Sequence, residues 1–257
     1  MAVNIQTIGV IGAGQMGSGI AHVCALAGFP VMLNDVAPDR IKAALATING
    51  NMAKQVAKKT ISEDDRKAAL SRIKAAEKYD DLATCDLVIE TAIEKEEAKR
   101  KIFSDLCASL KPEAIIATNT SSISITRLAS STDRPERFIG IHFMNPVPLM
   151  ELVEVIRGIA TDESTFEASK IFVRKLGKTI AVSEDFPAFI VNRILLPMIN
   201  EAIYTLYEGV GNVEAIDTAM VLLSLRTKTL LASKVWSSVA MPRMTSTSSI
   251  SGTGFMK

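Results

Sequence analysis

The sequence predicts an α/β fold in which a doubly wound parallel sheet is followed by a mainly helical C-terminal domain. Short apolar runs at 8–11, 31–34, 87–91 and 114–119 alternate with helical patterns, as expected for strands buried on both faces of a parallel sheet. A glycine-rich turn follows the first run directly, which marks a strand that passes into a helix. From residue 188 the apolar residues recur at helical spacing instead.

The first apolar run ends in a G-x-G-x-x-G pattern at residues 12–17. Gly12 permits a tight turn, Gly14 lets backbone N–H groups approach a pyrophosphate, and Gly17 lets the helix pack closely on the strand. The anion then lies at the positive end of the helix dipole. The pattern predicts a Rossmann-type dinucleotide-binding unit, and the expected cofactor-binding residues of the turn are Gly12, Gly14, Gln15, Met16 and Gly17.

The second apolar run ends in an acid, Asp35, roughly 20 residues after the glycine turn. Between the two runs, apolar residues recur at helical spacing and Gly28 ends the helix. A carboxylate at the end of the second strand accepts both ribose hydroxyls and repels a 2′-phosphate. The sequence therefore predicts NAD rather than NADP as the cofactor.

The composition excludes several classes of protein. A formal net charge of +1 leaves no excess field to hold nucleic acid or an anionic membrane. Three widely spaced cysteines and two histidines give neither a disulfide pattern nor metal-ligand spacing. The N-terminus lacks a signal-peptide pattern, and no apolar run approaches the roughly 20 residues of a membrane span. We therefore expect a cytoplasmic protein without metal, nucleic-acid or membrane partners.

A helical hairpin is expected between the second and third strands. Pro38 opens an amphipathic helix that carries Lys54, Lys58 and Lys59, and Ser62 caps the helix that follows. The lysine cluster fits either a solvated helix face or a rim that receives the phosphates of a large substrate.

A histidine ends a later strand on the edge of the sheet where ligands bind in doubly wound folds. The strand 138–141 leads into His142, and a rigid proline turn at 145–148 follows. In the next strand, Glu154 lies on the apolar face and needs a partner. A His–carboxylate pair fixes the tautomer and stabilises the imidazolium. His142 with Glu154 is therefore a candidate acid/base pair, and a satisfied core histidine is the alternative.

Residues 119–122 follow the strand that ends at Asn119. Ser122 or Ser124 fits the cap of the next helix, whereas Ser121 lies closer to the strand end and fits a donor to a substrate oxygen. Because no G-x-S-x-G elbow surrounds Ser121, a nucleophilic role is disfavoured. His22, inside the first helix, is expected to pack in the core.

From residue 188 the helix is apolar over most of its circumference, so we expect it to be buried against the first domain or in a dimer. We place a dinucleotide-binding domain with the hairpin insertion at residues 1–184. A truncated or divergent helical domain for substrate binding and dimerisation is placed at residues 185–257.

Four motifs occur in order, at residues 9–17, 119–122, 142–148 and 186–193. With them the chain closely resembles the 3-hydroxyacyl-CoA dehydrogenases over roughly residues 5–220, and within that family the bacterial enzymes acting on 3-hydroxybutyryl-CoA. The resemblance implies NAD-dependent oxidation of an (S)-3-hydroxyacyl-CoA to the 3-oxoacyl-CoA, or the reverse reduction. It also implies a CoA thioester as substrate and a homodimer.

The resemblance assigns a role to each candidate site residue. His142 is the general acid/base, paired with Glu154, and the C3 oxygen of the substrate receives hydrogen bonds from Ser121 and Asn192. Asp35 holds the adenosine ribose, and Lys54 faces the CoA phosphates. The nicotinamide half of NAD is contacted by Glu94 and Lys99, with Asn119 beside them.

After about residue 220 the sequence departs from the family pattern. Clustered Ser and Thr at 245–249 take the place of further helices and predict an aberrant terminus. Two alternative functions therefore stay open. One is a truncated homologue that binds the dinucleotide but is impaired in catalysis, and the other is a related hydroxy-acid dehydrogenase that does not use CoA.

Overall fold

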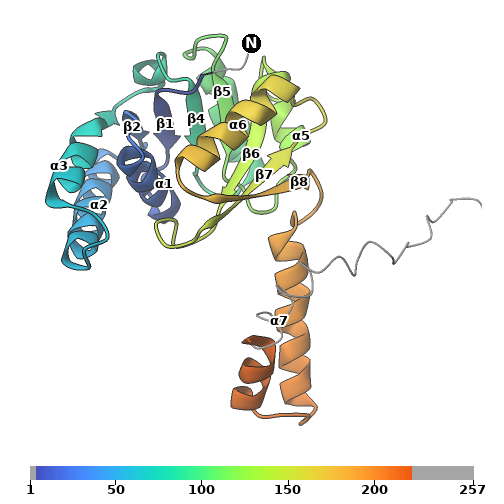
Figure 1. Ribbon diagram of the computed structural model, residues 1–257. Coiled ribbons are helices and arrows are strands. Elements are labelled where there is room, and N and C mark those ends of the chain that lie inside the picture. Colours follow the sequence, from blue (N-terminus) through green and yellow to red (C-terminus); the bar gives the residue numbers. More distant parts are fainter. Residues whose placement is uncertain (1–3, 222–257) are drawn as a thin grey trace, which may run out of the picture. The chain divides into compact units, whose positions relative to one another are not determined.

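The computed structural model describes residues 4–221, whose central element is a twisted sheet (Figure 1). In these residues the sheet has eight strands in the order β3-β2-β1-β4-β5-β6-β7-β8. Neighbouring strands are parallel except for β6 and β7, which are antiparallel. The strand bounds are β1 Ile8–Ile11, β2 Val31–Asn34, β3 Ile73–Ala76, β4 Leu87–Glu90, β5 Ile115–Thr118, β6 Phe138–Phe143, β7 Leu152–Arg157 and β8 Thr179–Glu184. The predicted α/β sheet is confirmed, and its strand order reverses at β1.

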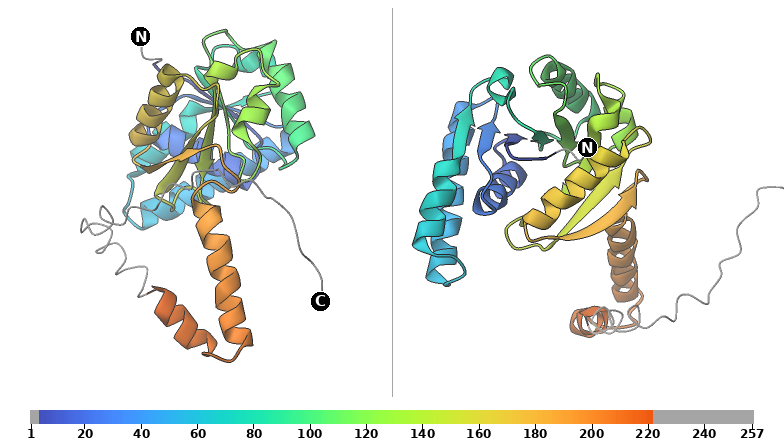
Figure 2. Two further views of the ribbon diagram at one scale, coloured as in Figure 1. Left: turned by 90° about the vertical axis from the view of Figure 1, so that its right-hand side faces the viewer. Right: turned by 45° about the horizontal axis from the view of Figure 1, so that its top comes forward.

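Helices cover both faces of the sheet (Figures 1 and 2). The main helices are α1 Gln15–Leu26, α2 Pro38–Ala57, α3 Glu63–Arg72, α4 Glu96–Cys107, α5 Ile125–Ala129, α6 Glu163–Lys175 and α7 Val191–Tyr207. One buried apolar cluster joins the sheet to α1, α2, α3 and α6. A second cluster joins the opposite face to α4 and α5. The strands are therefore buried on both sides, which explains their continuous apolar sequences.

The predicted helical hairpin between the second and third strands is confirmed. The Ser62 hydroxyl accepts a hydrogen bond from the Asp65 N–H at 3.0 Å, and the Asp65 carboxylate accepts one from the Ser62 N–H at 2.9 Å. This capping box starts α3, which runs beside α2 (Figure 2).

Strand β3 was not predicted. Its sequence lacks an apolar run because Lys74 and Ala75 face solvent at the edge of the sheet. Pairing with β2 gives this segment its extended form, and such tertiary pairing outweighs the weak local preference of a four-residue sequence.

Helix α7 begins later than the sequence predicts. Ala188 and Phe189 adopt left-handed backbone conformations, with φ of 67° and 51°, so helical geometry starts only at Val191. Phe189 is buried in the second apolar cluster. The helix was expected to be buried against the first domain or in a dimer. Within the described residues of the single chain none of its side chains is buried, and burial in a dimer stays a prediction.

Contacts divide the chain into two compact units, Met1–Leu195 and Leu196–Lys257. In the second unit, the end of α7 and a helix at 213–221 line an apolar groove of about 340 Å³. The predicted aberrant terminus after residue 220, with its Ser/Thr cluster at 245–249, lies outside the described residues apart from Val221. Across residues 4–221, no helix is long and apolar enough to cross a bilayer.

Candidate active site

The antiparallel pair β6–β7 brings His142 directly opposite Glu154. The Nδ1 atom of His142 lies 2.8 Å from Oε2 of Glu154, and the two residues are 5% and 0% exposed. Glu154 lies on the apolar face of its strand and therefore needs a polar partner, and His142 is that partner. An ionised carboxylate only accepts hydrogen bonds, so Nδ1 carries a proton, and in the neutral tautomer Nε2 is a hydrogen-bond acceptor.

The second carboxylate oxygen of Glu154 is held by the start of α7. The N–H groups of Ile190 and Val191 each donate to Oε1 at 2.9 Å. Burial alone would raise the pKa of Glu154, but the hydrogen bonds from His142, Val191 and Ile190 outweigh it and lower the pKa. The carboxylate therefore stays ionised and fixes the imidazole. The two backbone donors were not predicted from the sequence.

Ser121 lies on the other side of the imidazole. Its Oγ atom is 3.0 Å from Nε2 of His142, and since Nδ1 carries the proton, the Ser121 hydroxyl donates to Nε2. The Glu94 carboxylate holds this loop by accepting hydrogen bonds from the N–H groups of Ser121 and Ser122, at 2.9 and 3.2 Å. Ser124 caps α5, which confirms one of the two predicted caps. Ser121 remains available to a substrate oxygen.

Lys99 is buried and forms an ion pair with Glu90, a residue that the sequence analysis did not select. Its Nζ atom lies 2.7 and 2.9 Å from the two oxygens of Glu90, and both side chains are almost fully buried. The hydroxyl of Thr118 donates to the same carboxylate at 2.8 Å. Glu94 lies 3.5 Å from Nζ. The sequence offered one indication of this ion pair, because a carboxylate such as Glu90 at the end of a buried strand requires a cation.

Asn119 and Asn192 occupy different positions around the same strand ends. The side-chain oxygen of Asn119 accepts a hydrogen bond from the N–H of Phe143 at 2.8 Å, which ties the end of β5 to β6. Asn192 is the second residue of α7 and is partly exposed. Among the described residues, its side chain has no hydrogen-bond partner. It follows directly the two residues whose N–H groups hold Glu154.

The three glycines of the turn have the environments that the motif requires. Gly12 has φ of +96°, and a Cβ at Gly17 would lie 1.7 Å from the carbonyl oxygen of Gly12. A Cβ at Gly14 would meet nothing within 4 Å, so the space over this residue is open. No side chain caps the start of α1, and its first turn carries no acid. The helix N-terminus is therefore free for an anion.

Asp35 follows β2 and also braces the glycine turn. Its carboxylate accepts hydrogen bonds from the N–H groups of Ala13 and Ala37, at 2.8 and 3.0 Å. The residue is 8% exposed. The role of Asp35 toward the ribose hydroxyls stays a prediction.

We predict that Gly14→Ala weakens NADH binding at least about tenfold, equivalent to about 1.4 kcal/mol. The new methyl group meets no protein atom within 4 Å, so the loss of affinity reports the approach of the pyrophosphate. A small decrease in Tm accompanies the change, because Gly14 is the N-cap of α1 and Ala is a poorer N-cap than Gly. Fluorescence titration with NADH and a thermal melt measure the two quantities. Gly50→Ala is the matched control, because Gly50 also has free space and lies on α2. Unchanged NADH affinity in Gly14→Ala would contradict the assigned pyrophosphate position.

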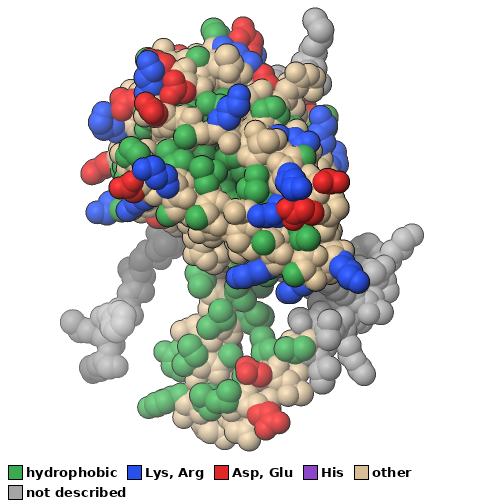
Figure 3. Space-filling model, turned by 90° about the vertical axis from the view of Figure 1, so that its left-hand side faces the viewer, with side chains coloured by type: hydrophobic (Ala, Val, Ile, Leu, Met, Phe, Trp, Pro, Cys, Tyr) green, Lys and Arg blue, Asp and Glu red, His purple; other side chains and the backbone are tan. Residues whose placement is uncertain are grey.

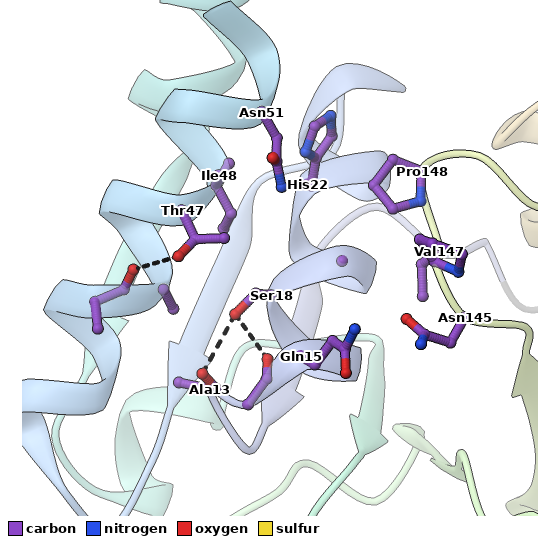
Figure 4. Close-up of a pocket in the computed structure, with 15 residues that line it drawn as sticks. Ala13, Gln15, Ser18, His22, Thr47, Ile48, Asn51, Asn145, Val147 and Pro148 are labelled. Atoms are coloured by element: carbon purple, nitrogen blue, oxygen red, sulfur yellow. Dashed lines mark hydrogen bonds between the residues drawn. The ribbon is translucent and has the colours of Figure 1, made fainter. Parts of the chain in front are cut away.

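Two adjoining cavities lie between α1, α2 and the segment 145–149. The first, of about 390 Å³, is lined by Gly14 and Gln15 of the turn, by α2 and by the proline segment (Figure 4). The second, of about 470 Å³, extends to Lys54 and Lys58. Asn51 lines both. Together they form a path from the glycine turn to the lysine cluster.

His22 has the packing position that the sequence predicts. It is 1% exposed, and its Nε2 atom lies 2.9 Å from the side-chain oxygen of Gln55. Burial lowers the pKa of His22, so the ring stays neutral. No group of His, Cys, Asp and Glu in residues 4–221 has the geometry to hold a metal ion.

Comparison with known proteins places this geometry in a family. Residues 7–186 match the model described as 3-hydroxyacyl-CoA dehydrogenase, NAD binding domain, and residues 189–236 match the C-terminal domain of the same family. The chain is 79% identical over 220 residues to a 3-hydroxybutyryl-CoA dehydrogenase of Bradyrhizobium diazoefficiens, covering 86% of this chain and 75% of that protein. A probable 3-hydroxybutyryl-CoA dehydrogenase of Bacillus subtilis is 47% identical over 84% of this chain and 75% of its own length. The crystal structure of an (S)-3-hydroxybutyryl-CoA dehydrogenase from Ralstonia eutropha superposes with a TM-score of 0.80 at 44% identity, covering 82% and 75% of the two chains.

Proposed function

The chain belongs to the 3-hydroxyacyl-CoA dehydrogenase family, and from this premise we propose that it oxidises (S)-3-hydroxybutyryl-CoA to acetoacetyl-CoA with NAD, and catalyses the reverse reduction. The observation that carries the proposal is the linear arrangement of Ser121, His142 and Glu154 at the edge of a dinucleotide-binding sheet. This arrangement supplies a neutral imidazole nitrogen, an oxygen-binding hydroxyl and a fixed carboxylate.

In the oxidation, the 3-hydroxyl group takes the place of the Ser121 hydroxyl as donor to Nε2 of His142, which removes its proton. Ser121 and Asn192 donate hydrogen bonds to the C3 oxygen and stabilise its developing charge. Glu154 stabilises the imidazolium that forms. NAD, when bound, supplies the hydride acceptor. In the reduction, the imidazolium returns its proton to the same oxygen.

The residues at the sheet edge fit NAD as cofactor. Gly14 and the uncapped start of α1 would hold the pyrophosphate, and Asp35 would receive the adenosine ribose. Glu94 and Asn119 would contact the nicotinamide half. Lys99 is buried, so it acts on that half through its charge and through Glu94 rather than by an exposed contact. The open space at Gly14 and the carboxylate at the end of β2 support this orientation.

The CoA arm of the substrate lies in the path between α2 and the proline segment, with its phosphates near Lys54. Lys54 is exposed on the last turn of α2, where it lines the second cavity. We predict that Lys54→Ala raises KM for acetoacetyl-CoA up to about fivefold, because an exposed ion pair contributes about 0.2–1 kcal/mol. The effect should vanish at high salt and with acetoacetyl-pantetheine, which lacks the nucleotide phosphates. Lys74→Ala is the control, and an equal effect on both thioesters would contradict the assignment.

Comparing kcat/KM for acetoacetyl-CoA and free acetoacetate tests the proposed function. NADH consumption is followed in both cases. We expect a strong preference for the thioester and little activity with NADPH. Comparable or higher activity with the free acid would instead support a hydroxy-acid dehydrogenase that does not use CoA.

A dinucleotide-binding homologue with impaired catalysis is the second candidate. It is favoured by the exposed apolar residues of the second unit (Figure 3). NADH fluorescence together with the turnover assay separates the two, because impaired catalysis would leave NADH binding intact while acetoacetyl-CoA reduction is absent.

A homodimer is the proposed assembly, formed through the apolar groove of the second unit. Ile203, 60% exposed, lines this groove with Met198 and Leu206, and Val213 and Met220 line its other side. Analytical ultracentrifugation of the full chain, with Ile203→Asp as the disrupting variant, tests the assembly. A monomeric full chain would contradict it.

A cytoplasmic location is proposed because the three cysteines are unpaired and two of them are buried. Burial raises the pKa of the Cys85 thiol to about 12 and that of Cys24 further still. Such thiols suit a reducing compartment.

A further inference from the structure

The segment 144–151 joins β6 to β7 and therefore separates the two members of the acid/base pair in the chain. The same segment also forms a wall of both cavities of the proposed substrate path. Val147 lines the first cavity, which reaches the glycine turn, Leu149 lines the second, which reaches Lys54, and Pro148 lines both. The width of the substrate path therefore depends on where this segment lies. Contacts with Lys178 and with helix α1 hold the segment in place.

Lys178, just before β8, holds the segment in place. Its Nζ atom donates hydrogen bonds to the carbonyl oxygens of Val147 and Met150, at 2.8 and 2.7 Å. Among the described residues, no carboxylate lies within ion-pair distance of this ammonium. A lysine on the surface normally points into water, whereas this one is partly buried and spans the two carbonyls of a single turn.

Helix α1 contacts the same segment. A Cβ at Gly19 would lie 2.8 Å from the Cβ of Val147, so the helix backbone and the segment are in direct contact. Lys178 lines a cavity together with α1 residues, so it lies on the helix side of the segment. Movement of Val147 away from α1 is opposed by the Lys178 hydrogen bonds, and movement toward α1 is opposed by the contact with Gly19.

The acid/base pair does not depend on this clamp. His142 and Glu154 are held by the β6–β7 ladder, from Gly140 opposite Ile156 to Phe143 opposite Val153. Glu154 is further held by the N–H groups at the start of α7. Loss of the clamp should therefore change the cavity wall more than the geometry of the catalytic pair.

We propose that Lys178 is a positioning residue for the thioester substrate, which clamps the segment 144–151 against Gly19 and so sets the width of the path for the CoA arm. The inference rests on the proposed function, because it assumes that the CoA arm lies in this path. It predicts a separation of KM from kcat, which a general loss of stability does not produce.

The test is steady-state kinetics of the full chain with acetoacetyl-CoA and NADH. Lys178→Met removes the donors and should raise KM for acetoacetyl-CoA about tenfold, while KM for NADH and kcat change less than about threefold. Lys178→Arg retains donors for both carbonyls and should recover most of the loss. Lys74→Met, on the exposed edge strand, is the matched control for removing a lysine charge.

Several outcomes would overturn the inference. An unchanged KM in Lys178→Met, equal losses for both substrates, or an arginine variant as poor as the methionine variant would each do so.

If Lys178→Met does not fold, Gly19→Ala provides the second measurement, because its methyl group displaces Val147 from the helix side. An unchanged KM for acetoacetyl-CoA in Gly19→Ala then refutes the clamp. Wild-type protein that does not reduce acetoacetyl-CoA refutes the proposed function and this inference with it, whereas active wild type with unaffected variants refutes the inference alone.

Discussion

His142→Gln is expected to lower kcat for acetoacetyl-CoA reduction by at least ~10²-fold, with little change in NADH affinity. Glutamine can accept a hydrogen bond from Ser121, but it can neither take up nor release a proton in this pH range. The ring that it replaces lies between Ser121 and Glu154 and contacts no part of the glycine turn in its hydrogen bonds. Turnover is measured by NADH absorbance and affinity by NADH fluorescence.

Thermal melts of His142→Gln and of the control variant Lys74→Met show whether His142→Gln still folds. The imidazole also packs against the ring of Phe189, with 5.8 Å between ring centroids, so a small loss of stability accompanies the change. A loss of turnover with a cooperative melt and normal NADH binding identifies proton transfer as the missing step. Turnover equal to that of the wild type would remove His142 from the mechanism.

The parts of the site that were predictable have local sequence signatures. The glycine turn is a contiguous motif, and the positive φ of Gly12 and the close packing at Gly17 agree with it, while the role of Gly14 toward a pyrophosphate stays a prediction. Glu154 was identifiable because a carboxylate on the apolar face of a strand must have a partner, and the antiparallel return of the chain leaves His142 as that partner. In both cases, the glycines and Glu154, the residue type is unfavourable in its segment unless a particular geometry requires it.

The parts that were not predictable depend on backbone groups or on conformation. The N–H groups of Ile190 and Val191 carry no side-chain signal, yet they hold Glu154 from 36 and 37 residues away in the chain. The delayed start of α7 arises from left-handed φ values at Ala188 and Phe189, which are not residues that favour this conformation. Lys99 was assigned through the family resemblance alone, and its partner Glu90 was missed although a carboxylate at the end of a buried strand requires a cation.

Glu154→Gln is expected to lower kcat by about 10²–10⁴-fold, the range for a catalytic imidazole held in the wrong tautomer. The amide oxygen can still accept from the N–H groups of Ile190 and Val191, which leaves the amide NH₂ facing Nδ1 of His142. Because an NH₂ group only donates, Nδ1 must then be the unprotonated nitrogen and Nε2 carries the proton. The nitrogen that faces the substrate oxygen can no longer act as a base.

Comparing Glu154→Gln with Glu154→Ala tests this explanation, because the two variants should fail in different ways. Alanine leaves two buried N–H groups without a partner, at about 1–3 kcal/mol each, so it should lower the Tm more than glutamine does. It imposes no tautomer, so its turnover should equal or exceed that of Glu154→Gln. Because the pKa of Glu154 is lowered, the ionised carboxylate stabilises the fold at pH values above its ordinary pKa of 4.5, and this contribution is lost as the pH falls through the folded-state pKa. The Tm difference between wild type and Glu154→Ala should therefore shrink in acid. If Glu154→Gln turns over faster than Glu154→Ala, the carboxylate does not act mainly by fixing the tautomer.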